Sequence, residues 1–413
     1  MTVHDLRSAK AQPARAKRAS LSGVPNWGED DIVTRARRVA DVAVRYAEAV
    51  DREARFPAEA IAAAKAEGLM GVLAPLALGG EGAGHGEVVE VCYVLGQACA
   101  STAMIYAMHQ VKVACVVRHG IGSHWHEGFI RRLVTEQLLL ASSTTEGQAG
   151  GNVRSSAAPV TYAGGRIRLD RDASVISYGL EADALVTTAR RSADAAPSDQ
   201  VLLVLDRADY SLVQTQTWDT LGMRGTASVG FALKADADVA QILPPAYEAI
   251  HSRSMVPAAH LFWSAAWAGV AASATDRARR FIRKAARNAG GQTPPAAAYL
   301  AKAMGSLRAL RALIATLSDR YAAIEDDAEA LAALDFQTAI NLLKVDASEL
   351  AVEAVMAAMR ACGLSGYRND SEASLGRHLR DILSAPIMIN NDRILANLAG
   401  ATLVADIPQS IRS

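Results

Sequence analysis

The sequence predicts an α+β protein in which a helical domain, a β domain and a helical bundle follow one another along the chain. Helical patterns of apolar residues occupy residues 25–138, and short β-favouring runs separated by turn residues occupy 139–244. From 245 to 413 the pattern is helical again, with long alanine-rich segments. Residues 1–24 are basic and lack an apolar stretch, which predicts a flexible tail, although a mitochondrial transit peptide would have a similar composition.

Composition narrows the class of protein and its partners. The 413 residues are enough for two or three domains with substantial cores. Basic and acidic residues number 43 each, so no net charge attracts nucleic acid or a membrane surface. No run approaches the roughly 18 uninterrupted apolar residues of a membrane-spanning helix. The four cysteines form no CxxC pair, which favours buried thiols in a reducing compartment, and we expect a cytoplasmic protein that binds a small molecule or another protein.

Turn residues mark the elements within the first two domains. In the first, Pro57 suits the first turn of a helix that Gly68 ends, and a longer helical pattern over 88–118 is interrupted near Ala100. In the second, the pair Gly164-Gly165 predicts a hairpin between two short β runs. The predicted strands of this domain lie at 160–162, 166–169, 184–188, 201–205 and 230–233.

Long helices dominate the last domain. A glycine- and proline-rich turn at 290–295 separates the first two of them. Helices are predicted at 256–288, 295–322 and 328–361, with a shorter one near 391–405. Four helices of these lengths imply a four-helix bundle.

Several motifs with well-known chemistry fail when their spacing is tested. The glycine-rich run 79–86 lacks the third glycine and the preceding strand of a dinucleotide-binding turn, so it is interpreted as a loop between helices. The GxxxxGK[ST] phosphate loop does not occur in the sequence. His119, His124 and His126 invite a metal site, but positions two apart face different sides of a helix and no other ligands complete the shell. We therefore expect no metal.

The run at residues 141–152 (ASSTTEGQAGGN) is the most informative one chemically. It offers hydroxyl groups, exposed backbone N–H groups and glycines that let the main chain approach a flat ligand closely. A flavin requires donors of this kind beside its polar edge. Spacing alone leaves open an ordinary loop, because Ser, Thr and Gly cluster in loops generally.

Four separate motifs, in the same order, resemble those of the acyl-CoA dehydrogenase family. Residues 145–152 (TEGQAGGN) resemble the family's TEPGAGSD loop, and 218–228 (WDTLGMRGTAS) resemble its W-x-x-x-GMRGTxS segment. Residues 74–82 and 100–109 resemble the preceding turn and helix. The resemblance covers nearly the whole chain after residue 25. It implies an N-terminal α-helical domain, a central β-barrel-like domain and a C-terminal four-helix bundle that bind FAD between them.

The resemblance also implies which residues hold the cofactor. The hydroxyl and glycine residues of the TEGQAGGN loop and a strand at 175–177 would face the isoalloxazine. Arg287 would reach the pyrophosphate of an FAD in a neighbouring subunit, since its fork suits phosphate oxygens, or else remain a solvated cation at a helix end. The cofactor-binding residues implied in this way are Ser143, Thr144, Thr145, Gly150, Gly151, Ile176, Ser177, Arg287 and Asn391.

The catalytic base of the family is missing from its usual place. Most members carry a glutamate after an arginine-aspartate pair, and it removes the α proton of the acyl thioester. Ile389 falls at that position, and Ala259 falls near the alternative position on the first bundle helix. Asp392, three residues away, is the candidate catalytic residue if it reaches inward. Otherwise it is a solvated or capping aspartate paired with Arg393.

The resemblance implies an FAD-dependent acyl-CoA dehydrogenase that oxidises an acyl thioester to its 2,3-enoyl form and passes electrons to an electron-transfer protein. Fatty acid metabolism is the expected context. The segment 375–381 also resembles the C-terminal form of flavin-dependent monooxygenases, although Met388 stands where they have a histidine. Such an enzyme would use oxygen and flavin reduced by a separate flavin reductase. A non-catalytic flavin- or acyl-binding homologue is the third possibility. A homodimer or homotetramer is expected, with its interface on the helices at 295–322 and 328–361.

Overall fold

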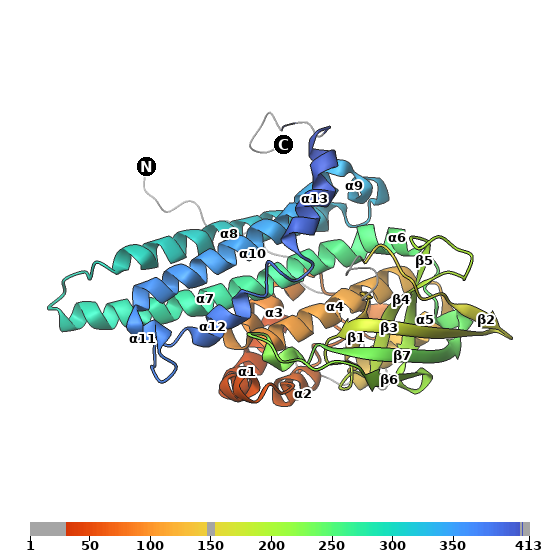
Figure 1. Cartoon of the computed structure of the whole chain (residues 1–413), viewed down its shortest axis with the longest axis horizontal. Coiled ribbons are helices and arrows are strands. Elements are labelled where there is room, and N and C mark those ends of the chain that lie inside the picture. The colour runs from red at the N-terminus through yellow and green to blue at the C-terminus, as the bar shows by residue number, and fades with distance from the viewer. Residues whose placement is uncertain (1–29, 147–152, 405–406, 408–413) are drawn as a thin grey trace.

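The structure is a computed structural model that describes residues 30–146, 153–404 and 407. A helical N-terminal domain, a middle domain of β-strands and a helical C-terminal domain follow one another, as the sequence predicts (Figure 1). Three long C-terminal helices run side by side along one half of the molecule, and the strands gather in the other half (Figure 1). Residues of all three parts contribute to one hydrophobic core.

Five α-helices form the described part of the N-terminal domain. They are α1 (Ile32–Glu53), α2 (Ala58–Ala66), α3 (His85–Ala98), α4 (Ala100–Gly120) and α5 (His124–Glu136). Asp31 caps α1 by accepting a hydrogen bond of 2.8 Å from the backbone N–H of Thr34. Cys99 adopts an extended conformation between α3 and α4, which confirms the predicted interruption near Ala100. Most residues of α4 are buried, so this helix lies inside the molecule rather than on its surface.

The described strands of the middle domain form two separate sheets rather than a closed barrel. The first sheet has the order β1 (Leu140–Ser143), β4 (Ala184–Arg190), β5 (Gln200–Asp206). The second has the order β2 (Thr161–Ala163), β3 (Arg166–Ile176), β7 (Val229–Asp238), β6 (Tyr210–Gln214). The predicted hairpin is confirmed, because β2 and β3 pair antiparallel across Gly164 and Gly165, both at positive φ. Strands β1 and β4 pair in parallel, so the chain that leaves β1 needs a long connection before it enters β4.

The C-terminal domain is built around α7 (Val256–Asn288), which packs against two further long helices, α8 (Ala297–Ile324) and α10 (Leu334–Cys362). Shorter helices are α6 (Tyr247–Ile250), α9 (Ala328–Ala332), α11 (Leu364–Tyr367), α12 (Gly376–Ile382) and α13 (Asn391–Thr402). The last of these packs against α10. One continuous helical segment, Tyr247–Asn288, is long and apolar enough to cross a membrane, but 89% of its most apolar window is buried inside the protein. It is therefore a core helix.

Two glycines let α3 and α7 approach each other closely. A Cβ on Gly96 would lie 2.3 Å from the carbonyl oxygen of Ala266, and a Cβ on Gly269 would lie 2.3 Å from that of Tyr93. Both distances are far below van der Waals contact. The absence of side chains at these two positions thus fixes how the N-terminal domain sits on the C-terminal one.

A second close contact joins the middle domain to the end of the chain. A Cβ on Gly222 would lie 2.1 Å from the carbonyl oxygen of Arg380. The next residue, Met223, donates its backbone N–H to Asp381 across 2.7 Å. Burial raises the pKa of Asp381 to about 6. This joint holds the loop at 218–228 against α12, and both segments border the cavity described next.

Candidate functional site

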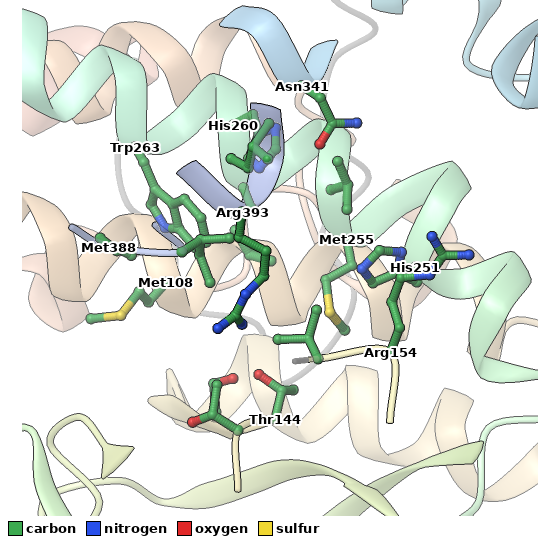
Figure 2. A pocket seen from close by; sticks show the side chains of 18 of the residues that line it. Met108, Thr144, Arg154, His251, Met255, His260, Trp263, Asn341, Met388 and Arg393 are labelled. Carbon is green, nitrogen blue, oxygen red and sulfur yellow. The ribbon is translucent and has the colours of Figure 1, made fainter. Parts of the chain in front are cut away.

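A cavity of about 1420 Å³ lies where the three domains meet. Its wall includes residues from α4, β1, the end of β3, the loop at 218–228, α7, α10 and the C-terminal segment from 380 onward. Figure 2 shows side chains from these elements pointing toward a common space, with Thr144 on the sheet side and His260 on the helix side. A drug-sized ligand occupies a pocket of roughly 300–1,000 Å³, so this cavity has room for a large cofactor with a substrate beside it.

Hydroxyl groups from β1 and its continuation form one edge of the cavity. Ser142, Thr144 and Thr145 line it, whereas Ser143 is fully buried behind them. This alternation follows from the strand, because successive side chains point to opposite faces. The side-chain Oγ of Ser143 has no hydrogen-bond partner among the described residues, and its carbonyl accepts a hydrogen bond of 2.9 Å from Thr187.

A second group of hydroxyls comes from the end of β3 and the start of β7. Ser177 lines the cavity beside Val175, while Ile176 between them is fully buried. The Oγ of Ser177 lies 2.7 Å from that of Ser228, which lies 2.7 Å from Oγ1 of Thr226. Because Thr226 and Ser228 also line the cavity, this chain of hydroxyls presents donors that can rotate toward a ligand.

The helical wall is mainly apolar but contains one histidine in a defined state. His260 is 3% exposed, and its Nδ1 lies 2.9 Å from the carbonyl oxygen of Ile340. Because a carbonyl can only accept, Nδ1 carries the proton and Nε2 is left as an acceptor. Burial lowers the pKa of His260 to about 4, so the ring is neutral at pH 7. Trp263, one turn further along α7, also lines the cavity (Figure 2).

The C-terminal loop before α13 closes another side of the cavity. Ile387, Met388 and Ile389 line it, and Ile389 has a positive φ of 55°. The loop is held from behind by Asn391, whose Oδ1 accepts a hydrogen bond of 2.7 Å from Nζ of the buried Lys344. Arg393, on the first turn of α13, points its guanidinium into the cavity toward Thr144 (Figure 2).

Only some of the cofactor-binding residues predicted from the sequence lie at the cavity. Thr144, Thr145 and Ser177 line it. Three more are buried directly behind its wall and do not line it, namely Ser143, Ile176 and Asn391. Arg287 is exposed in the last turn of α7 and does not line the cavity either. Gly150 and Gly151 lie outside the described residues.

The candidate catalytic residue is not at the cavity. Asp392 is exposed at the start of α13 and does not line the wall, and its backbone N–H donates to Oδ1 of Asn390. The two positions expected to carry a glutamate, Ile389 and Ala259, do line the cavity. Of the described lining residues, the only carboxylates are Asp199 and Glu248. The described residues contain no group of three or more His, Cys, Asp or Glu side chains that could hold a metal ion.

Four residues of the wall were not singled out by the sequence as site residues: Lys112, His260, Trp263 and Arg393. The first three lie within long apolar helices, where one polar or aromatic residue gives no periodic signal. Arg393 was read only as a partner for Asp392. A lysine within an otherwise apolar helix is nevertheless unusual, and that single residue was the signal available for Lys112.

The cavity fits a flavin by its size and by its donors. Hydroxyls of Thr144, Thr145 and Ser177 share one side, where the polar edge of an isoalloxazine needs hydrogen bonds. Methionine and tryptophan side chains on the opposite wall, among them Met108 and Trp263, offer an apolar surface for the ring. The cationic fork of Arg393 suits a phosphate oxygen of the cofactor. The fit is therefore supported both by chemistry and by volume.

Comparison with known proteins gives a consistent result. The model for the N-terminal domain of acyl-CoA dehydrogenases matches residues 28–123, and that for the C-terminal domain matches residues 260–403. A cyclohex-1-ene-1-carbonyl-CoA dehydrogenase from Geobacter metallireducens is 24% identical over 379 residues, which are 91% of this chain and 95% of that protein. The amino sugar nitrososynthase DnmZ from Streptomyces peucetius is 25% identical over 375 residues, 85% of this chain and 89% of that protein.

Among solved structures, the same fold occurs in FMN-bound TdsC from Paenibacillus sp. A11-2, a dibenzothiophene monooxygenase. Its TM-score is 0.79 at 19% identity, and the match covers 92% of this chain and 99% of that chain. The proteins similar to this chain thus include a dehydrogenase, a nitrososynthase and a monooxygenase. With two domain models that together match more than half of its residues, the chain belongs to the acyl-CoA dehydrogenase family, whose cofactor is a flavin, typically FAD.

Proposed function

We propose that this flavoprotein is a flavin-dependent monooxygenase, which takes reduced flavin from a separate reductase and oxidises a small organic molecule with oxygen. The observation that carries the proposal is the aliphatic character of both positions where a dehydrogenase of this family would need its glutamate. Ile389 and Ala259 line the cavity, and neither can accept a proton. A monooxygenase needs no base at the α carbon of a thioester, so this pair of residues is compatible with it.

The remaining carboxylates do not supply the missing base. Asp199 already pairs with Arg191, with 2.9 Å between Oδ1 and Nε. Glu248 lies on α6 and not at either of the two positions where the family carries its glutamate. Asp392 is exposed outside the cavity. Because general-base catalysis requires hydrogen-bond reach to the proton, these positions oppose α-proton removal by a carboxylate.

The side chains of the wall fit the proposed chemistry. Thr144 and Ser177 would donate hydrogen bonds to the polar edge of the flavin, and a bound reduced flavin supplies the activation of oxygen. Met108, Trp263 and Ile389 would exclude water from the reacting atoms. His260 would accept a proton from the substrate at Nε2, because its Nδ1 proton is engaged by the Ile340 carbonyl.

Acyl-CoA dehydrogenation remains the second candidate, and one observation favours it. His260 adjoins Ala259 on α7, and its neutral ring has an acceptor nitrogen, so it could replace the carboxylate as base. Transfer of electrons to an electron-transfer protein belongs to this second candidate. A homodimer or homotetramer through α8 and α10, and a cytoplasmic location, stay predictions for either function.

An anaerobic mixing experiment separates the two functions. The FAD-loaded protein is mixed with acyl-CoAs of several chain lengths, and the visible absorbance of the flavin is followed. We expect no loss of absorbance and no enoyl product. In a second arm, externally reduced FAD or FMN is mixed with oxygen, and the protein is expected to change the rate of flavin oxidation. Bleaching by an acyl-CoA together with an enoyl product would refute the monooxygenase.

A further inference from the structure

One lysine on the cavity wall has no ionic partner among the described residues. Lys112 lies on α4, is 4% exposed and lines the cavity. Its Nζ lies 3.5 Å from the thioether sulfur of Met255, which is its only hydrogen-bond partner among the described residues. No described carboxylate comes within 4.0 Å of the ammonium group. Lys112 is therefore almost completely removed from solvent without the acceptors that an ammonium group normally has.

This setting is costly for a residue with only a structural role. An ammonium group has three donors, and a thioether is a weak acceptor. Burial lowers the pKa of Lys112 to about 8, so the group is still mainly charged at pH 7. A methionine of similar length would fill the same space without that cost. A ligand with a negative charge would, in contrast, satisfy the ammonium directly.

Other nitrogen groups gather at the same end of the cavity. Lys112, Arg154 and His251 all line the cavity. Burial is the main cause that lowers the pKa of His251 to about 3, and the charges of Arg154 and Lys112 add to it. Figure 2 shows Met255, His251 and Arg154 on the side of the cavity opposite Met108. His251 and Met255 bound a π-helical turn before α7, and such turns occur frequently at functional sites.

The carboxylates at this end limit the charge of the ligand. Glu248 lines the cavity one turn before His251, and Asp199 lines it from the middle domain. Both carboxylates would repel a phosphate dianion about twice as strongly as a monoanion, and one ammonium group balances only a single negative charge. An organic carboxylate is thus the ligand class that matches the single buried charge of Lys112.

We propose that Lys112 binds the carboxylate of the substrate, with His251 and Arg154 lining the same subsite. The inference rests on the proposed function and names its substrate class: a small, largely apolar molecule that carries one carboxylate. Its carboxylate lies against Lys112, and its apolar part extends toward Met108 and Trp263. An acyl-CoA has no free carboxylate at the acyl end, so the subsite also distinguishes the substrate from an ordinary acyl thioester.

The test compares matched pairs of ligands that differ only in charge. Benzoate and benzamide, and acetate and acetamide, are titrated into the full-length protein, with and without FAD, and binding is measured from the shift in melting temperature. The variants are Lys112→Met, which keeps the length of the side chain, and Lys302→Met, which removes an exposed lysine of α8 that pairs with Glu353.

We expect the wild-type protein and Lys302→Met to bind benzoate at least about tenfold more tightly than benzamide, the size of a modest charge-assisted contact. In Lys112→Met this preference disappears, while benzamide binds as before and the ligand-free variant melts higher than wild type. Three results overturn the proposal: equal binding of both ligands to wild type, a preference retained in Lys112→Met, or no binding of either carboxylate at about 50 mM. If Lys112→Met does not fold, the wild-type comparison decides alone. Because no turnover is measured, failure of the subsite is distinguishable from failure of the monooxygenase.

Discussion

Replacement of Glu146 by glutamine tests how the loop beside the hydroxyl edge is anchored. Glu146 is 4% exposed and follows Thr145 directly. Its carboxylate accepts hydrogen bonds of 2.6 Å from the hydroxyl of Ser156 and from the backbone N–H of Ala157, and it lies 3.0 Å from Nη1 of Arg171. Arg171 is itself 1% exposed. Glu146→Gln thus removes the negative charge beside a buried guanidinium, whose other partner among the described residues is Thr188.

The expected loss of stability in Glu146→Gln follows from the buried ion pair. Breaking a buried ion pair from one side costs about 3–5 kcal/mol, because the remaining charge is uncompensated. The glutamine amide adds to this cost, since its NH₂ group must face one of the three donors that the carboxylate satisfied. At roughly 2 °C per kcal/mol for a chain of this size, we expect the melting temperature of Glu146→Gln to fall by at least about 6 °C. Flavin affinity should fall with it, because Thr144 and Thr145 precede the anchor directly.

Thermal melting with and without FAD is the assay, and a surface pair provides the control. Glu353→Gln removes the exposed partner of Lys302 and should change stability by less than about 1 kcal/mol. The double variant Glu146→Met with Arg171→Met should recover much of the loss, because apolar residues can replace a buried pair. A Glu146→Gln protein that melts within about 2 °C of wild type would refute this account of the ion pair.

Three further predictions concern the cavity and the helix packing. Ile389→Glu places a carboxylate at the vacant base position, and we expect it to gain bleaching of bound FAD by an acyl-CoA; an inactive but FAD-binding variant would contradict this placement. Gly269→Ala should destabilise the fold by about 2 kcal/mol or more, because the new Cβ would collide with the carbonyl oxygen of Tyr93. Gly305→Ala, with open space around it, should instead stabilise α8 by about 0.5–1 kcal/mol. Equal shifts in melting temperature for the two variants would be inconsistent with the close approach of α3 and α7. The pKa of His260 is lowered to about 4 in the folded protein, so the unfolded chain binds more protons below about pH 6.5, and stability should fall as the pH drops from there toward 4. Urea unfolding at pH 7 and pH 5 should show a smaller loss for His260→Gln, and an identical loss would count against a buried neutral ring.

The domain order could be predicted because it depends on local patterns. The helical and strand periods change near residue 139, and turn glycines such as Gly164 mark the hairpin at the same place as in the structure. The family motifs identified the cavity-lining Thr144 and Thr145 in advance. Local signals of this kind need no knowledge of which elements pack together.

Which side chains point into the cavity could not be predicted, because this depends on contacts between segments that are distant in the sequence. Whether Ser142 or Ser143 reaches the cavity is decided by the pairing of β1 with β4, whose register joins Ser143 to Thr187. Lys112 becomes a cavity residue only when α4 is covered by the turn that carries Met255. The described strands divide into two sheets instead of the expected barrel-like arrangement. Which strands pair with one another could not be determined from their sequence alone.

The joint between Gly222 and α12 has a consequence for biosynthesis. Met223 reaches its partner Asp381 only across 158 positions of sequence, so α12 leaves the ribosome after the N-terminal helices and both sheets. The nascent chain can build its N-terminal helices and both sheets before this contact is possible. The cavity bordered by both sides of the joint is therefore completed only after α12 has been synthesised, so premature termination before residue 376 should yield folded helices and sheets without this cavity.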